Sequence, residues 1–312
     1  MQLEPRRLVV LRAVARHGSV VAAAEALHLS PSAVSQQLGA LERECGVTLV
    51  DRSRRGGQRP IDFTPAGRRL IAQADRLVQV LDDTAAELAA LTESVGGPVT
   101  VSSFYTALRG FVAGAFADLG RSHPALRPQI HDVDELEITA EVLAGRIDVA
   151  VVEDDAQRRR PVPRGLHYEA LADDPFRLVV PVDWPEVDDL ADLADRAWID
   201  GPPGTALGYA MQRLRRVTGL PFASAHSCRE FTAALALVGA GMAGAVVPEL
   251  ALAAATPPPA EVRVSSPPGL GARRIGLLYR RGRREPTPAV HAVLDALRSA
   301  ASGQELTVRS LA

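Results

Sequence analysis

SVVAAAEALHLSPSAVSQQLGALERECG, residues 19–46, has the pattern of two short helices separated by a stop and a restart. Ser19 suits the N-cap of the first helix. Ser30 and Pro31 mark the start of the second helix. Serine suits the N-cap, and proline is favoured at the first helical position because an N–H there has no partner within the helix. The small residues Ala22–Ala24 let two helix backbones approach closely. Two helices that cross over so short a turn predict a helix-turn-helix, whose second helix enters the DNA major groove.

The second predicted helix has an apolar face and a polar face. Val34, Leu38 and Leu41 recur at i, i+4 and i+7 and are expected in the core. The opposite side carries hydroxyl, amide and guanidinium groups, which can hydrogen-bond base edges or phosphates. The alternative is an ordinary solvated helix face, because short motifs often match by chance. The DNA-contacting residues expected on this helix and its cap are Ser30, Pro31, Ser32, Ser35, Gln36 and Arg43.

A basic turn follows this helix. Residues 48–50 and 61–63 are predicted short strands, and they flank the Gly- and Arg-rich stretch DRSRRGGQRP. Clustered arginines beside a glycine turn suit phosphate or minor-groove contacts, as in a wing, although the alternative is a disordered basic loop. The arginines expected to contact DNA here are Arg52, Arg54, Arg55 and Arg59.

Charge is divided unevenly along the chain. Residues 1–69 hold 11 arginines and 6 acidic residues, a charge of +5, whereas residues 70–312 hold 24 and 31, a charge of −7. The net charge of −2 therefore hides a basic N-terminal part. That part coincides with the predicted DNA-binding segment, as counterion release from DNA requires.

A long helix is predicted from Thr64–Pro65 to about residue 94. Apolar positions recur in two heptad series, which are Leu70, Leu77, Thr84 and Leu91, and Ala74, Leu81, Leu88 and Val95. Four heptads favour a coiled-coil seam that joins two copies. The alternative is one amphipathic helix that lies against the next domain. The residues expected at the dimer seam are Leu70, Leu77, Leu81, Leu88 and Leu91.

Gly96–Gly97–Pro98 ends that helix, and strands then alternate with helices. The predicted strands are Val99–Phe104, Arg127–Val133, Ile147–Val152, His167–Leu171, Arg177–Pro181, Ala197–Ile199, Ala243–Val247 and Arg274–Arg280. The predicted helices lie near residues 106–120, 135–145, 205–218, 229–240 and 286–300. This order indicates an α/β domain with a parallel sheet.

A ligand site is expected where strands of this domain end and helices begin. Hydroxyls and free N–H groups at such ends suit a carboxylate or another small anion. Each hydroxyl could instead be a plain helix cap. Glu153 would disfavour a simple anion unless the ligand also carries an amine or a hydroxyl. The expected ligand-binding residues are Ser102, Ser103, Phe104 and Thr205, together with Val133, Glu153 and Ser227.

Several other classes are disfavoured by the sequence. No 18-residue apolar run predicts a membrane span, and the N-terminus lacks a secretory cleavage site, so a cytoplasmic protein is expected. Residues 239–244 match G-x-G-x-x-G but follow a helix, the reverse of the dinucleotide-binding context. The cluster His131, Asp132 and Asp134 is split between two strand faces, and Cys228 is expected to be an inert cysteine. We therefore expect no metal, no cofactor and no enzyme.

The first hundred residues resemble the N-terminal domain of the LysR-type transcriptional regulators, and the remainder resembles their effector-binding domain. Pro31 departs from the family pattern, which often has a polar residue there. The matching positions are Ala23–Ala24, Leu27, Ser30, Ala33–Val34–Ser35, Leu41–Glu42, Gly46, Leu49, Arg52 and Thr64–Pro65–Ala66–Gly67.

This resemblance implies an N-terminal all-α winged helix-turn-helix with a long linker helix, and a C-terminal α/β two-lobed domain like the periplasmic binding proteins. The implied boundaries are 1–64 for DNA binding, 65–95 for the dimerising linker and 96–302 for effector binding, with residues 303–312 as a flexible tail. Lobe I would span about 96–172 and 263–302, and lobe II about 173–262.

The implied function is a regulator that changes its engagement of a promoter when it binds a small effector, such as a carboxylate. The implied partners are an imperfectly palindromic double-stranded DNA, a second copy of the chain in a homodimer or homotetramer, and RNA polymerase. A solute-binding or transport component and an α/β enzyme are the alternatives, but the first leaves residues 1–95 without a role.

Overall fold

The computed structural model describes residues 3–51, 61–90, 95–134, 136–156, 161–186, 190–203, 205–255, 261–281, 286–303 and 307–308. The chain divides into two compact units, which we describe separately. The first is Met1–Glu93 with Ala144–Arg146, and the second is Ser94–Leu143 with Ile147–Ala312. None of the helices described is both long and apolar enough to cross a membrane.

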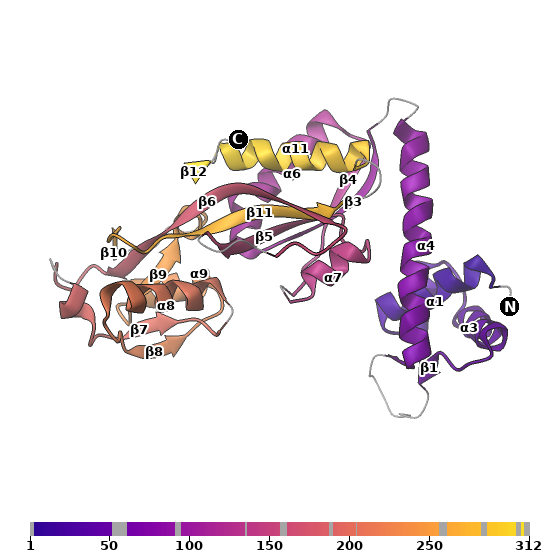
Figure 1. Cartoon of the computed structure of the whole chain (residues 1–312), viewed down its shortest axis with the longest axis horizontal. Helices are drawn as coiled ribbons and strands as arrows, with labels where there is room; N and C mark the ends of the chain where they lie inside the picture. The colour runs from indigo at the N-terminus through magenta and orange to yellow at the C-terminus, as the bar shows by residue number, and fades with distance from the viewer. Residues whose placement is uncertain are drawn as a thin grey trace. The chain divides into compact units, whose positions relative to one another are not determined.

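The N-terminal unit is a helix-turn-helix with a two-stranded wing (Figure 1). Its elements are α1 (Pro5–His17), α2 (Val20–Ala26), α3 (Pro31–Cys45), β1 (Val50–Asp51), β2 (Asp62–Phe63) and α4 (Pro65–Ala90). Ser19 and Ser30 cap α2 and α3 as predicted. Val34, Leu38 and Leu41 are buried, which confirms the predicted core face of α3.

Helix α4 packs its first three turns on the helix-turn-helix. Ala74 is fully buried, and Leu70 and Leu77 lie against the same core as Leu11 and Val14 of α1. These early heptad positions therefore serve the fold of the N-terminal unit of one chain, whereas the alternative in the sequence analysis was a helix that lies against the next domain. Leu81 is 55% exposed and so remains open to a partner. The predicted seam residue Leu91 lies outside the described residues, as does the side chain of Leu88.

The second unit is built on an eight-stranded sheet. Along the sheet the order is β10-β6-β11-β5-β3-β4, and β9 and β12 pair with β6. Strands β3, β4 and β5 are parallel, whereas β6, β9, β10 and β11 pair antiparallel. The strands are β3 (Gly97–Ser103), β4 (Leu126–Ile130), β5 (Val149–Asp155), β6 (Leu166–Pro181), β9 (Ala245–Pro248), β10 (Val262–Ser265), β11 (Ala272–Arg280) and β12 (Thr307–Val308).

The prediction of a parallel sheet was therefore wrong for most of this sheet, in which, among the described strands, only the pairings of β3 with β4 and with β5 are parallel. The separately predicted strands 167–171 and 177–181 form one strand, β6, whose first part pairs with β11 and whose last part pairs with β9 and β10. One strand, β6, therefore belongs to both lobes. Its neighbours β11, β9 and β10 all run antiparallel to it. Figure 1 shows β6 running between the two lobes of this unit.

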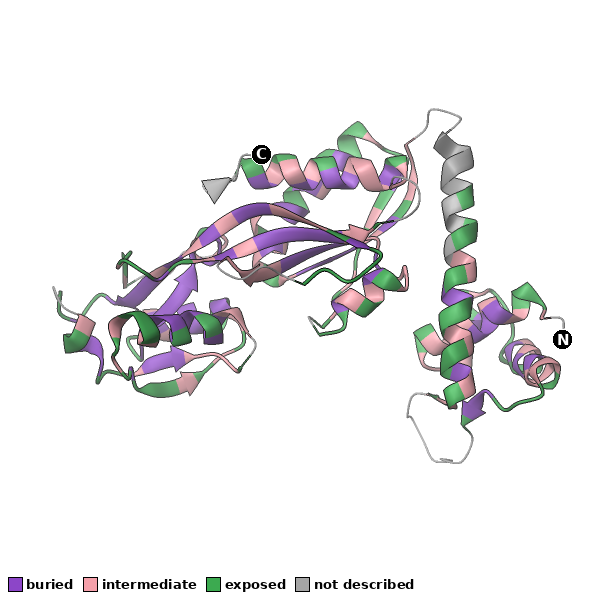
Figure 2. Cartoon of the chain, viewed as in Figure 1, coloured by how far each residue is buried: buried purple, intermediate pink, exposed green. Residues whose placement is uncertain are grey.

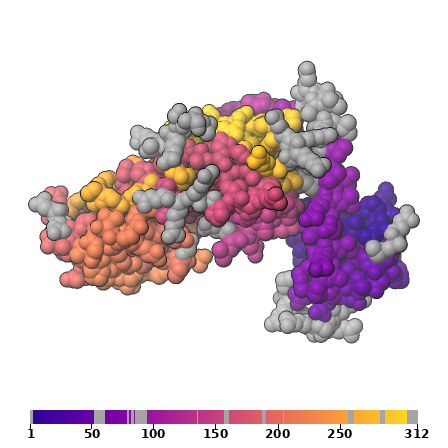
Figure 3. Space-filling view, in the orientation of Figure 1, coloured from indigo at the N-terminus to yellow at the C-terminus, as the bar shows by residue number. Residues whose placement is uncertain are grey.

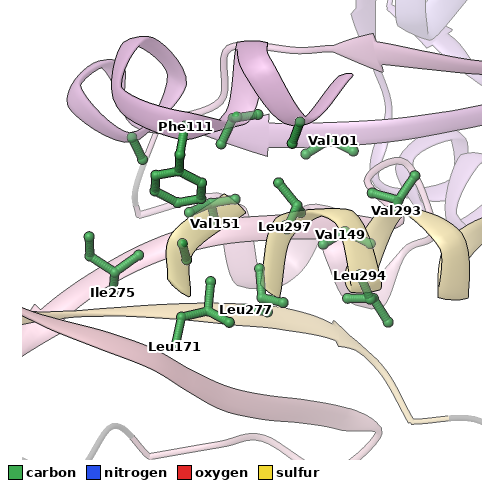
Figure 4. Packing of buried hydrophobic residues seen from close by; sticks show 14 of the residues in the cluster. Val101, Phe111, Val149, Val151, Leu171, Ile275, Leu277, Val293, Leu294 and Leu297 are labelled. Atoms are coloured by element: carbon green, nitrogen blue, oxygen red, sulfur yellow. The ribbon is translucent and has the colours of Figure 1, made fainter. Parts of the chain in front are cut away.

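Helices cover both faces of the sheet in lobe I (Figure 1). The segment 105–122 is one helical run with a π-helical turn in its middle. The helices of lobe I are α5 (Tyr105–Ala107), η1 (Leu108–Val112), α6 (Ala113–Ser122), α7 (Ile138–Leu143) and α11 (Pro288–Ser302). In Figure 4, Leu294 and Leu297 of α11 face Val149, Val151 and Leu277 of the sheet. In Figure 2, the buried residues of β5, β6 and β11 form the centre of the lobe.

Lobe II has its own core around Trp198. Its ring lies edge-on to Trp184 and Phe222, and its Nε1 donates to the Leu193 carbonyl at 2.9 Å. A Cβ on Gly244 would lie 2.8 Å from this ring, so the glycine serves close packing. The remaining elements of lobe II are η2 (Leu190–Leu193), β7 (Trp198–Asp200), α8 (Ala206–Thr218), β8 (Ser224–Ser227), α9 (Phe231–Gly239) and α10 (Glu249–Ala253).

Strands β8, β10 and β12, helix α10 and the short helix η2 were not predicted from the sequence. Strands β8 and β10 have four residues each and leave most of these residues exposed or half-buried, so they lack the apolar alternation that marks a strand. Figure 3 shows lobe II, in orange, adjoining the segments of lobe I within this unit.

Candidate functional site

The N-terminal turn of α3 is a network of short hydrogen bonds. Ser30 Oγ accepts from the Ala33 amide at 3.2 Å and lies 2.9 Å from Ser32 Oγ, while Ser35 Oγ donates to the Pro31 carbonyl at 3.0 Å. Ser30, Pro31, Ser32 and Ser35 are all exposed. Each serine keeps acceptor or donor capacity for a ligand, because a hydroxyl has one hydrogen and two lone pairs.

Gln36 and Arg43 extend this exposed face along α3. Both are exposed, and neither has a hydrogen-bond or ion-pair partner among the described residues. Gly39 lies between them on the helix, and a Cβ there would lie 3.6 Å from Arg43 Nη1. The face is therefore shallow in the middle, with an amide and a guanidinium on either side. Arg52, Arg54, Arg55 and Arg59 lie outside the described residues.

Side chains that the sequence analysis had not assigned hold α3 in place. Arg7 of α1 donates to Gln37 at 3.2 Å and is ion-paired with Glu44. Glu42 Oε1 accepts from the amides of Leu49 and Val50 at 2.9 and 3.2 Å, which anchors the first wing strand to α3. These contacts join residues that are 7 to 37 positions apart. Sequence spacing alone gave no signal for them.

The expected ligand residues are grouped in part at the end of β3. Ser102 and Ser103 are buried, Phe104 is half-buried, and Val133 lies beside the apolar cluster under α7. Ser103 Oγ donates to the Phe104 carbonyl at 3.2 Å. Ser102 has no hydrogen-bond partner for its hydroxyl in the described part of the chain. These positions agree with a strand-end site in lobe I.

The two expected ligand residues of lobe II, Thr205 and Ser227, differ in whether their hydroxyls are already used. Thr205 Oγ1 donates to the Pro202 carbonyl at 2.8 Å and accepts from the Gly208 amide at 3.2 Å, so it acts as the N-cap of α8. Its single hydrogen is used, which leaves little for a ligand. Ser227 is exposed at the end of β8.

Arg273 is the main residue that the sequence analysis missed. It lies on β11, is 2% exposed, and its Nε donates to Asp174 Oδ2 at 2.9 Å. Nη2 donates to Thr106 Oγ1 at 2.7 Å, and Nη1 is paired with Glu153. The guanidinium also lies 4.9 Å from the Phe104 ring and 5.5 Å from the Phe231 ring. Arg273 therefore joins lobe I, lobe II and the strand β6 that they share.

Acidic side chains lie around this arginine. Tyr105, next to Phe104, donates its hydroxyl to Asp132 Oδ2 at 2.8 Å. Glu230 precedes Phe231 at the start of α9. Partial burial and the nearby carboxylates of Glu153 and Asp132 raise the pKa of Glu230, although Arg229 opposes the shift. These carboxylates are therefore close enough to influence one another.

The other motifs do not gain a function from the structure. Burial raises the pKa of the Cys228 thiol, which disfavours a reactive thiolate. No group of three histidine, cysteine or acidic side chains in the described ranges could hold a metal ion. Residues 239–244 join α9 to β9, so their glycines do not open a helix onto a phosphate.

Two family models match the chain. Residues 5–68 match the bacterial regulatory helix-turn-helix protein, lysR family, and residues 92–302 match the LysR substrate binding domain. A probable HTH-type transcriptional regulator LrrA from Synechococcus elongatus is 27% identical over 307 residues, which cover 95% of this chain and 96% of that protein.

The match to another relative is shorter. It covers 57% of this chain and only 55% of a probable RuBisCO transcriptional regulator from Chlorokybus atmophyticus, at 28% identity. The solved structure of full-length CbnR complexed with its target DNA is 24% identical with a TM-score of 0.64, covering 96% of this chain and 100% of that one. At this identity the structural likeness shows the fold.

Proposed function

The chain belongs to the lysR family of bacterial helix-turn-helix regulators, and from this premise we propose that it regulates transcription by binding promoter DNA under the control of a small effector. The relatives named above are transcriptional regulators. The proposal accordingly assigns the chain no catalytic role. Residues 1–64 would bind DNA, 65–95 would join two copies, and 96–302 would bind the effector.

The exposed face of α3 carries the DNA-binding part of the proposal. Val34, Leu38 and Leu41 hold the helix on the core, while Gln36 and Arg43 remain exposed without partners among the described residues. A recognition helix needs such free amide and guanidinium groups to reach base edges and phosphates. Ser30, Pro31, Ser32 and Ser35 would lie near the backbone at its N-terminal end, and Arg52, Arg54, Arg55 and Arg59 would contact phosphates from the wing.

Effector binding would act on how two copies present these helices. An effector shifts an equilibrium only if it binds one arrangement more tightly than another. Arg273 links both lobes, so a ligand beside it would bias their relative position. We place the ligand near Ser102, Ser103, Phe104, Val133 and Glu153. Thr205 and Ser227 would contribute at most from the lobe II side.

Dimerisation would use the exposed part of α4. Val80 and Leu81 are 61% and 55% exposed and adjoin one another on this helix, and adjoining exposed apolar side chains are typical of an interaction surface. A dimer would bind two half-sites, and the operator would be an imperfect palindrome. Further pairing to a tetramer, contact with RNA polymerase and action in the cytoplasm belong to the same proposal.

A mobility-shift titration with the DNA upstream of the chain's own gene tests the proposal. We expect specific binding that weakens steeply as salt rises, because released counterions supply much of the affinity. Gln36→Ala should lose about 1–3 kcal/mol of discrimination against non-specific DNA. Gln129→Ala is the control, since Gln129 is an exposed residue of β4 in the other unit. The proposal fails if the wild-type chain ignores this DNA at low ionic strength.

A further inference from the structure

The buried arginine of the effector-binding domain is not available to a negatively charged ligand. Asp174, Thr106 and Glu153 accept hydrogen bonds from all three nitrogens of Arg273. The rings of Phe104 and Phe231 lie near its guanidinium, and the side chain is 2% exposed. A carboxylate could therefore reach this cation only by displacing one of these acceptors, and the charge of the guanidinium is already balanced by the two carboxylates among them.

Carboxylates outnumber cations around it. Asp132, Glu153, Asp174 and Glu230 carry four negative charges, whereas Arg273 and Arg229 carry two positive charges, which leaves two negative charges in excess among these six residues. Glu230 has no hydrogen-bond or ion-pair partner in the described part of the chain, and Glu153 keeps 18% of its side chain exposed. A partly desolvated excess of like charge is unfavourable unless an external cation compensates it.

Neutral hydrogen-bonding groups lie at the same strand end. Ser102 is 5% exposed, and its hydroxyl has no hydrogen-bond partner among the described residues, so its lone pairs are available to a ligand. Tyr105, three residues on, already directs its hydroxyl to Asp132. An ammonium or guanidinium group offers several N–H donors to such acceptors. No three histidine, cysteine or acidic side chains within the described ranges lie close enough to hold a metal ion, whereas an organic cation with several N–H groups can reach carboxylates that lie farther apart.

We propose that the effector of this chain is a small organic cation, a primary amine or a guanidinium compound, bound by Asp132, Glu153 and Glu230 with the Ser102 hydroxyl. This inference rests on the proposed function, since it names the ligand class of the same domain. It replaces the carboxylate expected from the strand-end hydroxyls alone. The carboxylates of Asp132, Glu153 and Glu230 determine the ligand class, while Arg273 positions Glu153 and Thr106 without touching the ligand.

Calorimetric titration of the purified full-length chain tests the ligand class with probes matched in shape and opposite in charge. The probes are benzylamine against benzoate, phenethylamine against phenylacetate, and putrescine against succinate, with agmatine as the guanidinium compound. We expect at least one cation to bind saturably at one per chain and to raise the melting temperature. Each matched acid should bind more weakly than its amine.

Two variants identify the residues that bind the cation. Glu230→Gln and Asp132→Asn should each weaken binding by about tenfold, since each removes a charged hydrogen-bond acceptor. Both side chains are partly exposed, so folding should survive. Glu186→Gln is the control, because Glu186 is 87% exposed and lies 3.7 Å from Arg263 in lobe II. The Glu186→Gln variant should bind the cation with the same affinity as the wild type.

Three results would overturn the inference: no cation binds, an acid binds more tightly than its matched amine, or neither site variant weakens binding. A mobility-shift assay with promoter DNA on the same preparation shows whether the ligand class alone is wrong or the proposed regulatory function is wrong. If the chain binds its promoter but no cation, only the ligand class is wrong. If it does not bind the promoter, the regulatory function itself is contradicted.

Discussion

Arg273 and Asp174, 99 residues apart in sequence, form an almost completely buried ion pair, with Nε 2.9 Å from Oδ2. Asp174 is 0% exposed, and its other oxygen accepts from the Leu250 amide at 3.0 Å. One carboxylate thus ties β11 to β6 and to the start of α10. The pair lies where the shared strand passes between the lobes, so it stabilises their junction.

Replacing Arg273 with methionine should lower the free energy of unfolding of the C-terminal unit by about 3–5 kcal/mol, since two carboxylates lose their cation in a buried position. Denaturant unfolding followed by tryptophan fluorescence measures it, because both tryptophans, Trp184 and Trp198, lie in this unit. Arg121→Met is the matched control. Its pair with Asp118 is 74% and 69% exposed, and its loss should be well below about 1 kcal/mol.

Two glycines of the N-terminal unit should respond oppositely to alanine. A Cβ on Gly67 would lie 2.2 Å from the Leu49 carbonyl oxygen, so Gly67→Ala must displace backbone and should cost about 1–3 kcal/mol. Gly39→Ala meets only Arg43 Nη1 at 3.6 Å and should stabilise α3 by up to about 1 kcal/mol. Thermal unfolding of both variants checks the pair. Equal melting temperatures would contradict the packing at Gly67.

Thr64 should contribute to stability through its hydroxyl. Oγ1 accepts from the Gly67 amide at 3.0 Å and donates to the Thr48 carbonyl at 2.7 Å, so it caps α4 and fixes the wing. Thr64→Val should lower the melting temperature, at a cost of about 1–2 kcal/mol, whereas Thr64→Ser should retain most of the stability. If serine were as damaging as valine, the methyl group and not the hydroxyl would be responsible.

Substitutions of Arg43 and of Gln36 should change different properties of DNA binding. Arg43→Gln should reduce the slope of log affinity against log salt concentration by about 1, the value for one phosphate contact. It should weaken binding to all DNA sequences to the same extent. Gln36→Ala should leave the salt dependence unchanged and reduce only the preference for the promoter. Mobility shifts at several salt concentrations, with promoter and unrelated DNA, distinguish them. A salt slope that is unchanged in Arg43→Gln would exclude a phosphate contact at this residue.

The helix-turn-helix could be predicted because its signals are local. Ser19, Ser30 and Pro31 mark helix starts within a few residues, and the burial of Val34, Leu38 and Leu41 follows from helical periodicity alone. The Arg273 cluster could not be predicted in this way. Its members come from β5, β6, α5, α9 and β11, and only the folded sheet brings them together. Ser102 and Glu153 were found from strand ends, whereas Asp174 carried no local signal.

The raised pKa of Glu230 makes a pH-dependent prediction about stability. Between the ordinary glutamate pKa and the raised folded value, the folded chain binds more protons than the unfolded chain. The contribution of Glu230 to stability is therefore greatest below that window and falls as pH rises through it. Without added cation, Glu230→Gln should be more stable than the wild type at neutral pH, and the difference should shrink near pH 4.5, the ordinary value for this group.

Melting temperatures of both proteins across this range provide the measurement, with Glu186→Gln as the exposed control that should show no such trend. The sign of the difference in melting temperature between Glu230→Gln and the wild type distinguishes two roles for the Glu230 carboxylate. If Glu230 served the fold, through a cap or an ion pair, its removal would destabilise the protein at neutral pH. A gain in stability on neutralising Glu230 would mean that the free chain retains an unfavourable charge, as expected when that charge is used to bind a cation.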